Sequence, residues 1–293
     1  MDTILQVLEI IAPVIIIVGI GVGWVAIGWE YHVQFVTRLT MTLAAPCLIF
    51  VSLMQTEIDP EALRNTALAA AVSYLGVAAV VFVLVRVMKL EIRTFLPPLI
   101  FGNTGNLGLP LALFAFGSAG FDLAVVVFAV MSILSFTVGV WIVSGSGSPL
   151  AAFKEPVVWG TIFGGLFLVN DWSLPVWTTN TLGLIGQMLI PIMLITLGVA
   201  VSRLKPETFT RAIWLAAIKY VICITVPLGV GLAFGLPAIA LGPLVMQVAT
   251  PVAVTSYMIA EKYKADSAEV ASLVVVSTVM SIVVLPLLIG FLI

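Results

Sequence analysis

Apolar residues occupy most of the chain in long runs, which short polar or Gly/Pro-rich clusters interrupt. A helix needs about 20 consecutive apolar residues to cross a bilayer, and most of these runs approach or exceed that length. The pattern predicts an all-α polytopic membrane protein with ten transmembrane helices. The predicted spans lie at about residues 4–27, 37–56, 64–87, 95–117, 121–144, 157–170, 179–201, 210–235, 238–260 and 268–292.

The composition agrees with this pattern. The chain has 293 residues, of which 62% are hydrophobic and 9% are charged, whereas about a quarter of the residues in a soluble domain are charged. Ten spans of about 20 residues leave only short loops and no room for a separate soluble domain. No basic region precedes the first span and no small-residue cleavage site follows it, which predicts a retained span rather than a signal peptide.

The basic residues predict the orientation. With ten spans, ten of the 12 Lys and Arg residues fall on one side of the membrane, Arg64 falls on the other, and Lys219 lies inside a span. Lys and Arg accumulate in cytoplasmic loops. We therefore expect a multi-pass protein of the plasma or inner membrane with both termini outside the cytoplasm.

Prolines lie at matching places in the two halves. Pro46 and Pro110 are 64 residues apart, and Pro191 and Pro251 are 60 apart. Two five-span repeats fit this spacing, and because five is odd the second repeat would be inverted, as in many secondary transporters. The predicted units are residues 1–144, a linker at 145–156, and residues 157–293.

The fourth span contains residues that disfavour a continuous helix. Its centre reads Asn103-Thr104-Gly105-Asn106-Leu107-Gly108-Leu109-Pro110, and in a helix interior Gly costs about 1 kcal/mol and Pro about 3 kcal/mol relative to Ala. Broken backbone at this depth is tolerated only where it is buried in protein or lines a cavity. We therefore predict a break at a binding site; the alternative is a simple kink.

The ninth span shows a milder version of this pattern around Gln247, Thr250 and Pro251. Pro251 removes a backbone donor, and the nearby polar side chains could bond the freed groups. If the two breaks meet, the half-helices starting near Pro110 and Pro251 would point their positive N-termini at one place and attract an anion. A simple kink is again the alternative, since Pro is common in membrane helices.

The string from Asn103 to Leu111 resembles the signature of the auxin efflux carrier family, which includes plant auxin exporters and bacterial permeases for malate, malonate and similar acids. The resemblance implies a sodium/proton antiporter-like fold with crossed broken helices and an elevator-like moving domain. It implies that Asn103, Asn106 and Pro110 lie at the substrate crossover and Pro251 on its second arm. The chain departs from the plant members in two ways: its linker has only about a dozen residues, and it has Glu261-Lys262 where many plant members have Lys-Glu. Auxin specificity is therefore not carried over.

Lys219 is the only charged residue clearly at membrane depth by sequence, and a buried charge at that depth costs at least about 2.5–3.5 kcal/mol. Its ammonium could bond freed carbonyls or the substrate anion at the crossover, in the place that sodium fills in related folds. Alternatively, its stem could extend to the cytoplasmic surface.

Small-residue patterns permit close helix contacts and are candidates for a static scaffold or a homodimer face. They are Gly19, Gly21 and Gly23 in the first span, and Gly160 and Gly164 in the sixth.

Other function classes find little support. A net charge of −2 provides no basic stripe for nucleic acid, and one histidine with dispersed carboxylates argues against a metal site. Cys47 and Cys223 lie in apolar runs, where cysteine usually acts as a small hydrophobe. The chain has no candidate catalytic pair or nucleotide-binding segment, so we expect neither an enzyme nor a cofactor.

We therefore expect a secondary transporter of a small organic anion, a carboxylate, in contact with membrane lipid. Asn103 and Asn106 would donate to the carboxylate, and Gln247 and Thr250 would complete the second arm. Spans one, two, six and seven would form the scaffold, and the other six would carry the site between the two faces. The rival interpretation is a membrane sensor that binds an organic acid without moving it. Substrate, coupling ion and direction stay open. The candidate binding residues are Asn103, Thr104, Gly105, Asn106, Pro110, Lys219, Gln247, Thr250 and Pro251.

Overall fold

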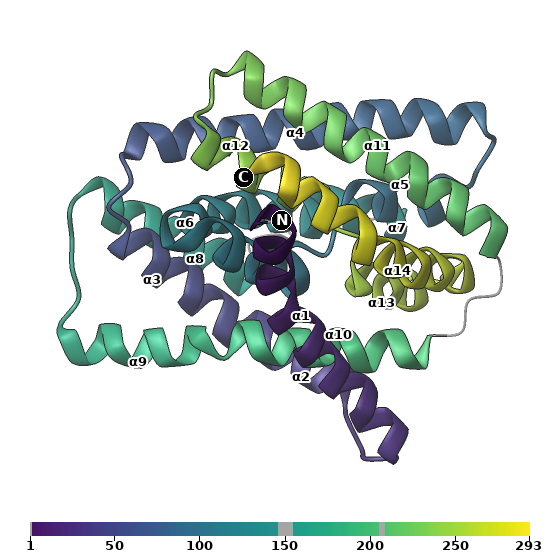
Figure 1. Ribbon diagram of the computed structural model, residues 1–293, viewed down its shortest axis with the longest axis horizontal. Helices are drawn as coiled ribbons and strands as arrows, with labels where there is room; N and C mark the ends of the chain where they lie inside the picture. Colours follow the sequence, from purple (N-terminus) through teal and green to yellow (C-terminus); the bar gives the residue numbers. More distant parts are fainter. Residues whose placement is uncertain (1, 146–154, 205–208) are drawn as a thin grey trace.

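The fold is known from a computed structural model, which describes residues 2–145, 155–204 and 209–293 (Figure 1). Within these ranges the chain is helical, apart from turns and one isolated β-bridge. Most of the predicted linker at 145–156 lies outside the described residues. Seven helices in the described part are long and apolar enough to cross a membrane, which supports a polytopic membrane protein. They are Val7–Ile27, Val33–Gln55, Pro60–Val87, Thr104–Ser144, Val176–Arg203, Phe209–Ala233 and Ser267–Leu292.

Five of the predicted runs correspond to uninterrupted helical stretches. The second of them changes to a π-helical turn shortly before Pro46 and then continues as an α-helix. The elements are α1 (Asp2–Ile27), α2 (Val33–Leu39) with η1 (Thr40–Ala44) and α3 (Ala45–Gln55), α4 (Pro60–Val87), α11 (Phe209–Ala233) and α14 (Ser267–Leu292).

The other runs are short or broken. The predicted fourth and fifth runs share one helical stretch, whose backbone leaves helical geometry at Gly117 (φ 66°, ψ −164°) between the two runs. The breaks predicted in the fourth and ninth spans are present, at residues 101–103 and 249–253. The elements are α5 (Ile92–Ile100), η2 (Thr104–Gly108), α6 (Leu109–Leu134), η3 (Ser135–Gly139), α7 (Val140–Ser144), α8 (Pro156–Val169), α9 (Val176–Gln187), α10 (Leu189–Arg203), α12 (Ala238–Val248) and α13 (Val254–Lys262).

Two groups of helices pack mainly among themselves. In one, α1 lies against α10, and α3 lies against α8 and α9. In the other, α4 and α6 pack with α11, α12 and α14; α4 and α11 form one edge of the molecule, opposite α9 and α10 (Figure 1). Glycines allow the close contacts in the first group: Gly21 meets Ile195, and Gly160 meets Pro46, but no atom lies within 4 Å of a β-carbon added at Gly19 or Gly23.

One arginine joins the ends of three helices. Arg93, near the start of α5, donates from Nε to the carbonyl oxygen of Val143 at 2.8 Å and from Nη2 to that of Tyr263 at 3.0 Å. These acceptors lie in α7 and directly after α13, so the cation satisfies carbonyls at the negative ends of two helices. The contact holds the elements that flank both breaks in one unit.

Candidate functional site

The two broken helices meet at their breaks. The backbone N–H of Asn103 donates to the carbonyl oxygen of Pro251 at 2.7 Å, and Gly102 and Val252 form an antiparallel β-bridge. Each break therefore supplies a hydrogen-bonding partner for the other, which is what buried backbone requires away from water. The two breaks therefore meet, as the prolines and glycines predict, and we call the place where residues 101–103 contact residues 249–253 the crossing.

Two glycines allow this close approach. A β-carbon at Gly102 would overlap Oγ1 of Thr250, and one at Gly108 would overlap Oε1 of Gln247. Both partners belong to the second broken segment and are fully buried. The glycines in the fourth span are therefore needed for contact between the two segments, in addition to their effect on helix continuity.

After the first break, helical bonding begins earlier than the sequence predicts. The α-helix α6 starts at Leu109, next to Pro110, but the π-helical turn η2 extends helical bonding back to Thr104, because the N–H groups of Leu107 and Gly108 both bond the carbonyl of Asn103. In the second segment α13 starts at Val254. The first amides of a helix have no acceptor within it, so each start carries partial positive charge.

Both starts line one small cavity. Asn103 is only 4% exposed there, and its Nδ2, like Oγ1 of Thr104, has no hydrogen-bond partner among the described residues. None of the described residues that line the cavity is charged, and its volume of about 30 Å³ has room for a water molecule or two. The lining residues are Met41, Gly102, Asn103, Thr104, Gly105, Asn106, Phe128, Met131, Ser132, Ser135, Phe136, Ala253 and Thr255.

Lys219 lies at the crossing but outside the lining of this cavity. It is 1% exposed, and its Nζ donates to the carbonyl oxygen of Thr250 at 3.0 Å, just beyond the C-terminal end of α12. Its Nζ also lies 3.6 Å from Sγ of Cys223. Of the two alternatives left open by the sequence, the structure favours the bond to a freed carbonyl over extension to the surface.

The remaining candidates support the crossing in this conformation. Gln247 donates from Nε2 to the carbonyl of Ala124 at 3.4 Å, while its Oε1 has no partner among the described residues. Thr250 donates from Oγ1 to the carbonyl of Gln247 at 2.7 Å. Neither these two nor Pro110 and Pro251 are among the residues that line the cavity. The structure thus gathers Asn103, Thr104, Gly105 and Asn106 on the cavity and the other candidates behind it.

Several lining residues were not predicted. Ser132 and Ser135 contribute hydroxyls from α6 and η3, and Phe128 and Phe136 contribute an apolar wall. Two serines three positions apart share one helix face, and this spacing within an apolar run was the available sequence signal. Nothing in the sequence indicates which face of that run meets the crossing.

Two larger cavities open at opposite ends of the α9–α10 stretch. The first, which we call the Asp122 cavity, has a volume of about 550 Å³ and lies between α3, α6 and α9. There Oγ of Ser52 donates to Oδ1 of Asp122 at 2.6 Å. The second, the Arg203 cavity, has a volume of about 560 Å³ and lies between the α1–α2 turn, the end of α10 and α13.

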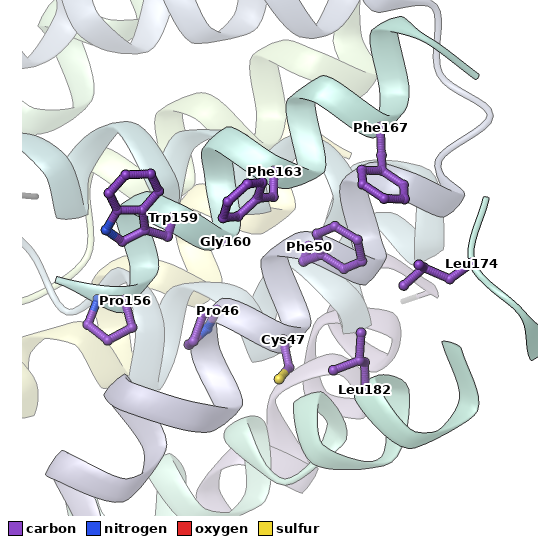
Figure 2. A pocket seen from close by; sticks show the side chains of 10 residues that line it. All are labelled: Pro46, Cys47, Phe50, Pro156, Trp159, Gly160, Phe163, Phe167, Leu174 and Leu182. Atoms are coloured by element: carbon purple, nitrogen blue, oxygen red, sulfur yellow. The ribbon is translucent and has the colours of Figure 1, made fainter. Parts of the chain in front are cut away.

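A third hollow is apolar. Figure 2 shows Pro46, Cys47 and Phe50 on α3 facing Trp159 and Phe163 on α8. Leu174 and Leu182 help to bound this groove of about 460 Å³. Its described lining residues carry no charge, and besides the indole of Trp159 and the thiol of Cys47 they offer no side-chain donor, so the crossing is the better candidate for an anion.

Comparisons with known proteins agree with a transporter. Residues 148–289 match the family model described as membrane transport protein. A protein of Methanothermobacter thermautotrophicus named an uncharacterized transporter is 26% identical over 192 residues, which cover 63% of this chain and 63% of the relative. The match therefore spans less than two thirds of the relative's length. These similarities confirm the predicted family resemblance and support a membrane transporter.

Proposed function

We propose that this protein is a secondary transporter of a small organic anion, which binds where the two broken helices cross. The observation that carries the proposal is that two helix starts line one cavity, through Thr104 of η2 and through Ala253 and Thr255 at the start of α13, together with the buried, unpartnered polar atoms of Asn103 and Thr104. Buried polar groups usually have partners, and a carboxylate oxygen would supply an acceptor to the amide of Asn103.

The electrostatics favour an anion over a cation. Each helix start carries about half a positive charge, and no described residue of the lining carries a negative charge that would compensate it. Lys219 adds a positive charge behind the crossing. Asn103 and Asn106 would orient the carboxylate, while Phe128 and Phe136 would contact the rest of the substrate.

The packing supports an inverted repeat of two five-helix units. Under that symmetry the first span corresponds to the sixth and the second to the seventh. The contact of α1 with α10 then has its counterpart in the contact of α8 with α3. The breaks of the fourth and ninth spans are likewise equivalent, and they are the ones that cross.

The proposed mechanism is elevator-type alternating access. The scaffold would consist of α1, α2–α3, α8 and α9–α10, which are also the proposed face for a homodimer. The helices α4–α7 and α11–α14 would move as a unit with the crossing. The closed centre and the two larger cavities at opposite ends of α9–α10 fit a conformation in which the site is shut and each face keeps part of an access route. Both termini would lie outside the cytoplasm.

The test is uptake by the purified protein in liposomes, with radiolabelled malate, malonate and indole-3-acetate as probes. Saturable uptake that protein-free liposomes lack supports the proposal. Saturable binding to the purified protein without uptake would instead support the sensor. If the protein neither takes up nor binds any of these probes, that result would contradict an organic-anion site of this class.

A further inference from the structure

The Arg203 cavity adjoins the crossing along the second broken helix. Val254, Tyr257 and Met258 of α13 line it, while Ala253 and Thr255, from the same end of that helix, line the central cavity. On the opposite wall, α2 leads into η1, whose Met41 faces the centre. A solute in this cavity is therefore separated from the crossing by the first turns of α13 and by η1.

Arg203 is an exposed residue of this cavity, and one hydrogen bond orients its side chain. It ends α10, and its Nη1 donates to the carbonyl oxygen of Tyr31 at 2.7 Å. Tyr31 is held in turn by a hydrogen bond of 2.7 Å between its hydroxyl and Oγ1 of Thr196. Among the described residues this is the only hydrogen bond of the guanidinium, and its five N–H donors leave several for a carboxylate.

Other groups in the cavity shape its charge. Burial raises the pKa of Tyr31, and this effect outweighs the opposing effect of its hydrogen bond with Thr196. The phenol therefore stays neutral at physiological pH and does not cancel the arginine. Glu261, on the α13 side of the cavity, contributes a carboxylate, and His32 lies on the α1–α2 side.

We propose that the Arg203 cavity is a second, entry-side anion site, where Arg203 captures the carboxylate of the transported acid before it reaches the crossing and Glu261 keeps this binding weak. The proposal rests on the transport function proposed above. A charge at the rim of a cleft raises the local concentration of its counter-ion and the association rate, in a salt-dependent way. A weak first site lets the substrate leave for the second.

The test compares Arg203→Gln, Glu261→Gln and the matched control Arg38→Gln. Arg38 is an exposed arginine on α2 that does not line the cavity. Uptake of radiolabelled malate and indole-3-acetate is measured against substrate concentration and ionic strength, in right-side-out and in inverted membrane vesicles. We expect Arg203→Gln to raise KM about fivefold, with unchanged kcat, in one of the two orientations only. Glu261→Gln should lower KM there, and Arg38→Gln should leave it unchanged.

The ionic strength separates capture from a structural effect. High salt should raise the wild-type KM toward that of Arg203→Gln, and the variant should respond less, because screening acts on the charge that has been removed. If Arg203→Gln keeps the KM and the salt response of the wild type, the entry-side site is overturned while the transport function stands. Equal effects in both orientations would also overturn it. Absence of saturable wild-type uptake would instead overturn the transport function together with this inference.

Discussion

Lys219 donates a hydrogen bond of 3.0 Å from its Nζ to the backbone oxygen of Thr250, inside the break of the second crossing helix. The carbonyl follows the C-terminal end of α12, where the helix dipole is negative and a cation is stabilising. Lys219 thus satisfies a freed carbonyl and places a positive charge behind the proposed anion site. Its burial, at 1% exposure, is explained by this partner.

Replacing Lys219 with methionine should therefore reduce transport. Lys219→Met keeps the apolar stem but removes the charge and the bond to Thr250, and a hydrogen bond with a charged group contributes enough for a loss of at least about tenfold in uptake. Expression should persist, because the substitution also removes a buried charge. Uptake into liposomes and membrane yield measure the two effects. Lys89→Met, at an exposed position after α4, is the control, and near-normal kinetics of Lys219→Met would refute this role.

Gly102→Ala tests the close approach of the two breaks. The added methyl group would overlap Oγ1 of Thr250, and overpacking of this kind typically costs about 1–3 kcal/mol. We expect a lower melting temperature in detergent and a loss of uptake. The control is Gly165→Ala in α8, where no atom lies within 4 Å of the added carbon. Equal melting temperatures and uptake for the two variants would show that the segments do not cross this closely.

The bond between Ser52 and Asp122 links the proposed scaffold to the proposed moving unit. Because this state must be left in every cycle, weakening the 2.6 Å contact should raise kcat about two- to fivefold in Ser52→Ala and in Asp122→Ala. The double variant should show little further change, since both substitutions remove the same interaction. Initial rates of uptake at saturating substrate measure kcat. Additive effects of the two substitutions would mean that this bond does not connect the moving parts.

Much of the architecture could be predicted from the sequence, because membrane spans and helix breaks depend mainly on local composition. Proline and glycine at membrane depth have strong local effects on a helix, so the breaks at residues 101–103 and 249–253 could be expected, and the need to satisfy freed backbone suggested that they meet. The start of η2 at Thr104 was missed because a π-helical turn depends on the contacts around Asn103 and leaves no clear pattern.

The division of the candidate residues could not be predicted in the same way. Asn103 and Gln247 are both polar residues at a break, yet Asn103 lines the cavity and Gln247 packs between Ala124 and Gly108. Which side of the crossing a residue occupies depends on the rotation of two segments that are far apart in sequence. The same long-range packing turns Ser132 and Phe128 toward the site, and spacing alone does not reveal it.

Equilibrium binding to the purified protein shows whether a carboxylate binds against Asn103 at the crossing. Asn103→Asp replaces an amide donor with a carboxylate of nearly the same shape, so a bound anion would lose a hydrogen bond and meet a like charge. Asn170→Asp, at an exposed position after α8, is the matched control. The probe is whichever of malate, malonate and indole-3-acetate the wild type binds most tightly. We expect Asn103→Asp to weaken binding of this probe by at least about tenfold and Asn170→Asp to leave it unchanged. Wild-type affinity in Asn103→Asp would mean that no carboxylate binds against Asn103.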